Sequence, residues 1–333
     1  MEDIFVPKTS GEDALVKQLH TVTYVTAEPD RVAQILVEGF GLSPVESLPQ
    51  GSSHPDAATR HLGFSSEDAW GATIFRKIGE GENVQVRLLS VEPQQAQVRR
   101  DHSGRDLGAV TLSFPMRDLV AHEQSMQHLD VASTIGVKEM EFASPDGQTY
   151  ISAEILYKAP ENVLLLGVRR PEQFVPVGPI DPATGLGGPA YSARCVADPD
   201  KLLEVLQGVM GFEIRRDAVF TIGERSGLLL PEGTQERFIQ AFAPGAATGY
   251  LILMDHFDVA RKPAASTAPP NRGLVMWSFE TSDLDEVVRR AEALGLTILS
   301  PPGQRNSPGL PTSRTAVVED SEGFPLEFFE RSD

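Results

Sequence analysis

Apolar and polar positions follow the same order four times along the chain. A short strand-like segment is followed by an acidic turn, an amphipathic stretch and a glycine or polar stop. Segment 24–42 resembles segment 194–212 without a gap, so that Gly41 falls opposite Gly211, and similar segments begin at Thr111 and Met276. Alternation at every second position is typical of a half-buried strand, and recurrence every third or fourth position is typical of a helix. Each copy therefore predicts a strand followed by a helix.

The last copy shows the helical pattern most clearly. Its apolar residues fall on one helix face, and they are Leu284, Val287, Val288, Ala291 and Leu294. Gly295 then suits the left-handed position just beyond a helix end. Short β-rich segments follow each predicted helix. The pattern thus predicts four units of one strand, one helix and several strands, at 19–98, 107–157, 188–257 and 272–331.

A stretch rich in proline and glycine separates the second unit from the third. It runs over 159–187 and includes the apolar segment 163–168, which we expect to be ordered within a packed connector. A chain of 333 residues is long enough for about two domains. We therefore predict an N-terminal pair of units over 1–158, the connector over 159–187, and a C-terminal pair over 188–333.

Composition narrows the possible partners. Lys and Arg number 29 against 47 Asp and Glu, a formal net charge of −18, which argues against nucleic acid and anionic membranes as partners. Cys195 is the only cysteine, so neither an internal disulfide nor a multi-cysteine metal site can form. No apolar run approaches the length of a spanning helix, and the first residues do not resemble a signal peptide. We expect a cytoplasmic protein.

Two segments resemble the vicinal oxygen chelate superfamily, which includes glyoxalase I, ring-cleaving dioxygenases and bleomycin-binding proteins. They are DPDKLLEVLQGVMGF (198–212) and VVEDSEGFPLEFFER (317–331). The resemblance implies an α+β fold in which four βαβββ modules pair into two cupped mixed sheets. It also implies a small organic ligand as partner, and a possible homodimer.

The resemblance further implies a divalent metal held by His or Gln on the first strand of a module and Glu on the last. The matching first-strand positions are Thr21, Thr111, Tyr191 and Met276, which are poor ligands. Glu327 keeps the last-strand position, and Glu154 is a looser match. His20 lies one residue away from a ligand position and would need a β-bulge to reach it. We therefore expect a degenerate metal site and no cofactor. The alternative is Fe, Mn, Ni or Zn bound through His20, Glu154 or Glu327.

Strand alternation then predicts which side chains face the cups. Two carboxylates and a phenol in a partly apolar cup can separate in pKa and act as acid and base, so Glu327, Tyr191 and Glu280 are the catalytic candidates. Arg170, after the apolar segment, could hold an anionic group. The candidate substrate-binding residues are Thr21, Thr111, Met276, Ser278, Cys195 and Arg170. The structural alternatives are a cap or solvated role for Glu280, an ion pair of Glu327 with Arg314, and a buried apolar role for Cys195.

Three functions stay open at this point. The first is a metal-independent enzyme performing lyase- or isomerase-type acid–base chemistry on an oxygenated aromatic or carbonyl compound. The second is a protein that sequesters a drug or metabolite without changing it. The third is a ring-cleaving dioxygenase with non-standard metal ligands.

Overall fold

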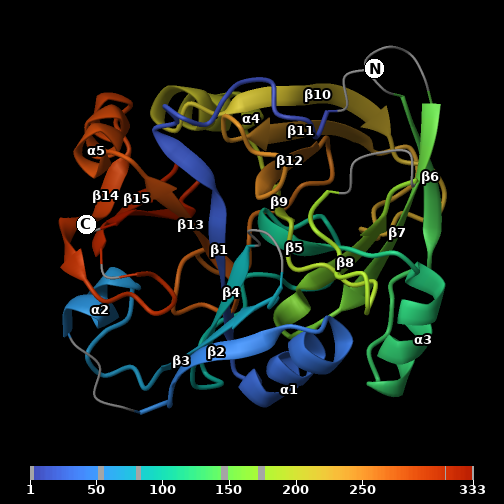
Figure 1. Ribbon diagram of the computed structural model, residues 1–333, viewed down its shortest axis with the longest axis horizontal. Coiled ribbons are helices and arrows are strands. Elements are labelled where there is room, and N and C mark those ends of the chain that lie inside the picture. The colour runs from blue at the N-terminus through green and yellow to red at the C-terminus, as the bar shows by residue number, and fades with distance from the viewer. Residues whose placement is uncertain are drawn as a thin grey trace.

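The chain forms two mixed eight-stranded sheets with few helices, as the four-module prediction required (Figure 1). The computed structural model describes residues 4–51, 56–79, 84–143, 149–171, 177–311 and 313–331. The first sheet has the strand order β14-β15-β16-β13-β1-β4-β3-β2, and the second has the order β10-β11-β12-β9-β5-β8-β7-β6. Antiparallel pairs β1/β13 and β5/β9 form the sheet centres.

The elements follow one another in the predicted modular order. The strands of the first sheet are β1 (Val16–Thr26), β2 (Ser43–Leu48), β3 (Gly71–Arg76), β4 (Gln85–Ser90), β13 (Gly273–Thr281), β14 (Thr297–Arg305), β15 (Ser313–Glu319) and β16 (Pro325–Arg331). Those of the second are β5 (Gly108–Pro115), β6 (Lys138–Ala143), β7 (Thr149–Lys158), β8 (Leu164–Arg169), β9 (Tyr191–Cys195), β10 (Glu213–Thr221), β11 (Gln235–Phe242) and β12 (Tyr250–His256). The helices are α1 (Pro29–Gln34), α2 (Asp56–His61), α3 (Leu119–His128), α4 (Pro199–Leu203) and α5 (Leu284–Ala293).

The pairing of modules differs from the predicted division into an N-terminal and a C-terminal pair. The first and fourth modules share one sheet, and the second and third share the other. Strand alternation specifies which face of each strand is buried, but it carries no signal about which distant module completes the sheet. The expected pairs over 1–158 and 188–333 are therefore corrected to a nested arrangement.

The predicted connector over 159–187 also begins too early. Its apolar segment is β8 (Leu164–Arg169), the last strand of the second module, which pairs in parallel with β5. A continuous apolar run is typical of a parallel strand buried on both faces, and the flanking turn at Pro160–Asn162 made it look like part of a linker. Glu154 consequently lies on the third strand of its module and not on the last.

The two sheets pack against each other through their convex faces. One large apolar core joins them, with Val22 of β1, Phe114 of β5 and Trp277 of β13 among its fully buried members. Trp277 Nε1 donates a hydrogen bond to Ser192 Oγ of β9 across 3.1 Å, a direct link between the sheets. The concave faces therefore point away from each other, and each is a separate candidate for a ligand site.

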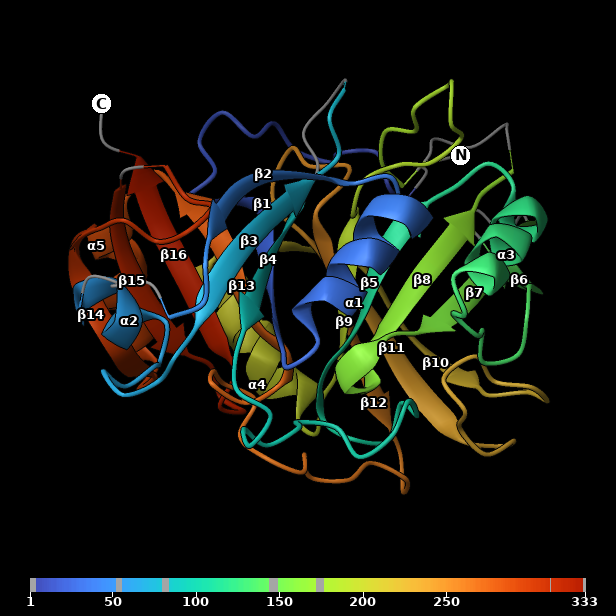
Figure 2. The same ribbon diagram turned by 90° about the horizontal axis from the view of Figure 1, so that it is seen from below.

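The repeated sequence produces a repeated helix shape. Helix α1 continues into a π-helical turn at Ile35–Gly39, and α4 continues into one at Glu204–Val209. Gly41 and Gly211 follow these turns with φ of 66° and 75°, the left-handed conformation that glycine adopts without strain. Figure 2 shows α1 beside β4. The left-handed position predicted for Gly295 is confirmed by its φ of 72°.

Within the described ranges, no helix combines the length and apolar character needed to cross a membrane.

Candidate functional site

A buried ion pair occupies the concave face of the first sheet, which we call the β1/β13 cup. Arg87 of β4 and Glu327 of β16 are both fully buried, and Arg87 Nη2 donates to Glu327 Oε2 across 2.6 Å. His61 Nε2 lies 2.8 Å from Glu327 Oε1, and the hydroxyls of Ser278 and Ser307 also donate to this carboxylate. Burial alone would raise the pKa of Glu327, but the Arg87 charge and the His61 hydrogen bond hold this pKa well below its usual range.

The residues of the β1/β13 cup do not fit the divalent metal that the resemblance implies. Arg87 already supplies the positive charge opposite Glu327, and its guanidinium also donates to Thr23 and Ser278. Thr21 and Met276 keep the first-strand positions without providing imidazole or carboxylate donors. Across the described part of the chain, no three His, Cys, Asp or Glu side chains gather in a way that could hold a metal.

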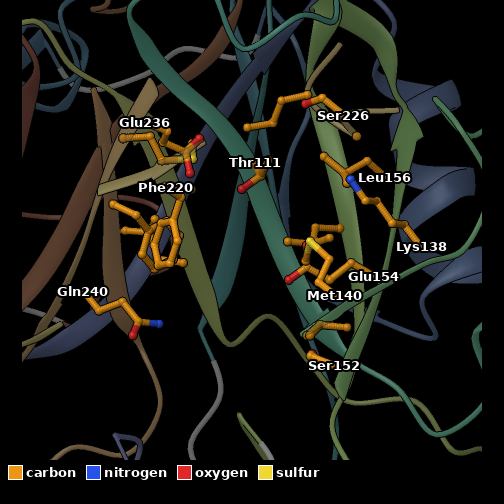
Figure 3. A pocket seen from close by; sticks show the side chains of 18 of the residues that line it. Thr111, Lys138, Met140, Ser152, Glu154, Leu156, Phe220, Ser226, Glu236 and Gln240 are labelled. Atoms are coloured by element: carbon orange, nitrogen blue, oxygen red, sulfur yellow. The ribbon is translucent and has the colours of Figure 1, made fainter. Parts of the chain in front are cut away.

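The concave face of the second sheet, the β5/β9 cup, contains a cavity of about 430 Å³. The sheet curls so that its two edges face each other across this space. Figure 3 shows Phe220, Glu236 and Gln240 on one wall and Lys138 and Glu154 on the opposite wall; Thr111 of β5 lies between the walls. A volume of this size is within the range of small-molecule sites.

Among the carboxyl groups that line this cavity, Glu154 has a strongly shifted pKa. It projects from β7, where its neighbours in the sheet are Lys138 of β6 and Val168 of β8. Burial, together with the negative charge of Glu236, raises the pKa of Glu154 to about 7, and the positive charge of Lys138 only partly opposes them. A carboxyl group that titrates near neutral pH can both accept and donate a proton under ordinary conditions.

Glu236, on the opposite wall of the cavity, is in contact with the imidazole of His256. His256 Nε2 lies 2.7 Å from Glu236 Oε2, and His256 Nδ1 lies 2.8 Å from the carbonyl oxygen of Gly104. Since a carbonyl only accepts, Nδ1 carries a proton, and the second proton on Nε2 is donated to the carboxylate. Burial opposes this charge, but hydrogen bonds to Cys195 and Glu236 outweigh it and raise the pKa of His256 to about 10. The cavity thus places a carboxyl group that is hydrogen-bonded to His256 opposite the titratable Glu154.

The floor of the β5/β9 cup combines aromatic rings with polar atoms that lack partners. The rings of Tyr191, Tyr250 and Phe242 stack in a column, with centroids 4.5 Å and 4.4 Å apart. Burial raises the pKa of Tyr191, so its hydroxyl stays protonated at neutral pH. Thr111 Oγ1 and Gln240 Oε1 are buried and, within the described residues, form no hydrogen bond. Because an unpaired buried polar atom is costly, these two atoms suit a ligand that carries oxygen or N–H groups.

The structure separates the residues that the sequence grouped as one catalytic site. Tyr191, Thr111 and Arg170 line the cavity of the β5/β9 cup, whereas Glu327 lies in the β1/β13 cup. Thr21, Met276 and Ser278 surround the Arg87–Glu327 pair and are fully buried with it. Glu327 and Glu280 therefore do not share a site with Tyr191, and the proposed combination of these three residues is corrected. Strand alternation predicted which side chains face a cup, but it could not predict which sheet each strand joins.

The remaining predicted residues have separate positions. Glu280 forms ion pairs with Lys17 and Arg331 at the ends of β1, β13 and β16, so its structural role is an ion pair and not the cap or solvated position given as its alternative; Asp283 caps α5 instead. Glu327 does form an ion pair, but with Arg87 and not with Arg314, which binds Glu330 and Asp285 instead. Cys195 is buried, forms a hydrogen bond with His256 and is not among the residues that line the cavity.

A β-bulge does occur at His20, as the alternative metal model required. The register of β1 against β13 shifts between Leu19 and Thr21. The His20 ring packs edge-on against Phe329, with centroids 4.9 Å apart, and its Nδ1 lies 2.8 Å from Thr21 Oγ1. Burial and the nearby Arg331 charge lower the pKa of His20 to about 4, so it is neutral at pH 7.

Sequence reasoning missed Glu236, Gln240 and His256. The signal for the first two was present, because residues 236, 238 and 240 alternate along the strand QERFIQAF and face the cavity. Arg87 was also missed, because a strand arginine is usually read as solvent-exposed.

Comparisons with known proteins agree with this architecture. Residues 188–328 match the family model of the Glyoxalase/Bleomycin resistance protein/Dioxygenase superfamily. Glyoxalase I from Zea mays is similar in structure, with a TM-score of 0.62 and 13% identity over 95% of this chain and 92% of that one. A putative dioxygenase from Bacillus subtilis has a TM-score of 0.57 and 11% identity over 96% of this chain and 87% of that one. A sequence search of curated proteins found no match.

These identities establish a shared fold and leave the chemistry open. The family match covers the third and fourth modules, and the structural similarity extends the same architecture to the first two. Residues 188–328 therefore match the Glyoxalase/Bleomycin resistance protein/Dioxygenase superfamily, and the chain as a whole has a glyoxalase I-like fold, with four βαβββ modules arranged in two cupped sheets.

Proposed function

We propose that the protein catalyses proton transfer on a small oxygenated carbonyl compound bound in the β5/β9 cup, with Glu154 as the general acid–base group. The observation that carries this proposal is the placement of Glu154 in the cavity wall with a pKa raised to about 7 by burial and by Glu236. This is the lyase- or isomerase-type chemistry expected from the sequence, assigned to a different carboxyl group. Glu236 lies on the opposite wall, where it is hydrogen-bonded to His256.

The aromatic floor and the unpaired polar atoms support an aromatic carbonyl compound as the ligand class. Tyr191 and Tyr250 offer ring surface against which a planar ligand can pack. Thr111 Oγ1 can donate a hydrogen bond to a carbonyl oxygen, and Gln240 Oε1 can accept one from a hydroxyl or N–H group. The guanidinium of Arg170 lies over the Phe5 ring at 3.4 Å from its centroid and lines the same cavity, where it favours a ligand carboxylate.

The proton transfer balances with these groups alone. Ionised Glu154 removes a proton from the carbon next to the carbonyl, and the C–H electron pair moves into the carbonyl to form an enolate. The Thr111 hydroxyl stabilises the enolate oxygen by a hydrogen bond. Protonated Glu154 then returns a proton to carbon, either to the same atom or to a neighbouring one in an isomerisation.

Solvent deuterium exchange tests the proposal. The purified protein is incubated in D₂O with a panel of aromatic aldehydes, ketones and keto acids, and loss of the α-proton signal is followed by NMR. We expect Glu154→Gln to lower the exchange rate about 100-fold or more while leaving binding nearly unchanged, because only the proton-transferring oxygen is lost. The exchange rate in the wild-type protein should rise with pH through about 7, the pKa of Glu154.

Glu292→Gln, an exposed change of the same kind on helix α5, is the matched control and should leave exchange unaltered. Exchange that persists in Glu154→Gln would contradict the assigned role. A carbonyl compound that binds tightly to the wild-type protein and shows no exchange would favour the sequestering function.

A further inference from the structure

A second cavity, of about 410 Å³, opens at the end of the first sheet where β1 begins and β13 and β16 finish. It is separate from the cavity of the β5/β9 cup and has a different character. Its lining is polar and includes Lys17, His20, Arg76, Lys77, Glu280 and Arg331.

Positive charge is concentrated around this cavity. Four side chains that line it are cationic, and one, Glu280, is anionic. Glu280 is already bound by Lys17 at 2.7 Å and by Arg331 at 2.9 Å. In a chain with 47 acidic and only 29 basic residues, this local excess of cations is opposite in sign to the overall charge.

Two of the cations form no carboxylate contact with the residues that the structure describes. In the parts of the chain that the structure describes, neither Arg76 nor Lys77 forms an ion pair. Lys77 is partly buried, and this burial lowers its pKa. The negative charge of Asp181 opposes this shift only in part. A partly buried ammonium group without a close counter-ion is unfavourable, and an anion in the cavity would relieve it.

We propose that this cavity binds a small organic or inorganic oxyanion, with Arg76 and Lys77 as its principal contacts. Guanidinium and ammonium groups that line one cavity can form charge-assisted hydrogen bonds to carboxylate or phosphate oxygens. The neutral ring of His20 adds a polar contact without adding charge. The site does not depend on the acid–base role of Glu154, because the two cavities belong to different sheets.

Isothermal titration at low ionic strength tests this proposal, with inorganic phosphate and succinate as probes. We expect saturable binding of at least one probe, weakened about tenfold or more in Arg76→Gln and in Lys77→Gln, since each loses a charge-assisted hydrogen bond. Phosphate binding alone would identify a phosphate-type ligand, and tighter succinate binding a carboxylate. Lys201→Gln is the control, because Lys201 pairs with Asp198 on the surface of α4 and should not affect binding. Absence of saturable binding with both probes, or equal affinity in wild type and both variants, would overturn the proposal.

Discussion

Replacing Arg87 with methionine is expected to lower the free energy of unfolding by about 3–5 kcal/mol, the cost of leaving one partner of a buried ion pair alone. Methionine fills much of the same space, so the loss arises from charge and not from a cavity. Glu327 would remain fully buried, with its carboxylate facing only His61, Ser278 and Ser307. Urea denaturation followed by circular dichroism measures the change.

Two comparisons make this prediction specific. The double variant Arg87→Met with Glu327→Leu should recover most of the loss, because no charge is then buried. Arg314→Met breaks a half-exposed pair with Glu330 and should cost only about 0–1 kcal/mol. If Arg87→Met cost no more than Arg314→Met, the buried pair would not stabilise the β1/β13 cup as described.

Glu154→Gln is expected to stabilise the protein above pH 7 while it abolishes proton transfer. The pKa of Glu154 is about 7 in the folded protein and 4.5 in the unfolded chain. Between pH 4.5 and pH 7 the folded protein therefore binds more protons than the unfolded chain does. Stability must therefore fall as pH rises from about 4.5 to about 7, by up to roughly 3 kcal/mol in total. Glutamine cannot ionise, so the variant escapes this loss.

Urea unfolding of both proteins at pH 5, 6, 7 and 8 measures the difference. His256 has the same sign of effect at higher pH, because its pKa is raised from 6.5 to about 10 and its contribution is lost as pH rises through that window. Subtracting the two curves cancels His256 and isolates Glu154. Parallel curves for wild type and Glu154→Gln would show that the carboxyl group is ionised at pH 7 like an ordinary glutamate.

The modular fold could be predicted from sequence because its signals are local. The strand and helix periods, and the matching Gly41 and Gly211, all depend on neighbours within one module. The pairing of modules could not be predicted, because it depends on contacts such as the pairing of Val22 on β1 with Trp277 on β13, which join residues far apart in the chain. For the same reason, β8 was predicted to be part of the connector, because its pairing with β5 is not visible in the local sequence.

In the candidate site, too, features that depend on neighbouring residues could be predicted, and features that depend on contacts between distant residues could not. Alternation along β5 and β9 correctly placed Thr111 and Tyr191 in a cup. Glu154 was named only as a possible metal ligand, because its raised pKa arises from Glu236 and from burial, neither of which is visible near it in sequence. Glu327 was misassigned for the converse reason: its partner Arg87 lies on another module and turns a candidate catalytic acid into half of an ion pair.

The nested pairing of modules has a consequence for how the chain folds as it is synthesised. All strands of the second sheet lie between Gly108 and His256, so this sheet can close before the last module has been translated. β1, by contrast, must wait for β13, since Val16 pairs with Thr281. During this delay one edge of β1 stays without its partner, and such an edge can pair with a neighbouring nascent chain. Closure of the first sheet is thus a late, high-contact-order step, and it is the step at which we expect a chaperone to matter most.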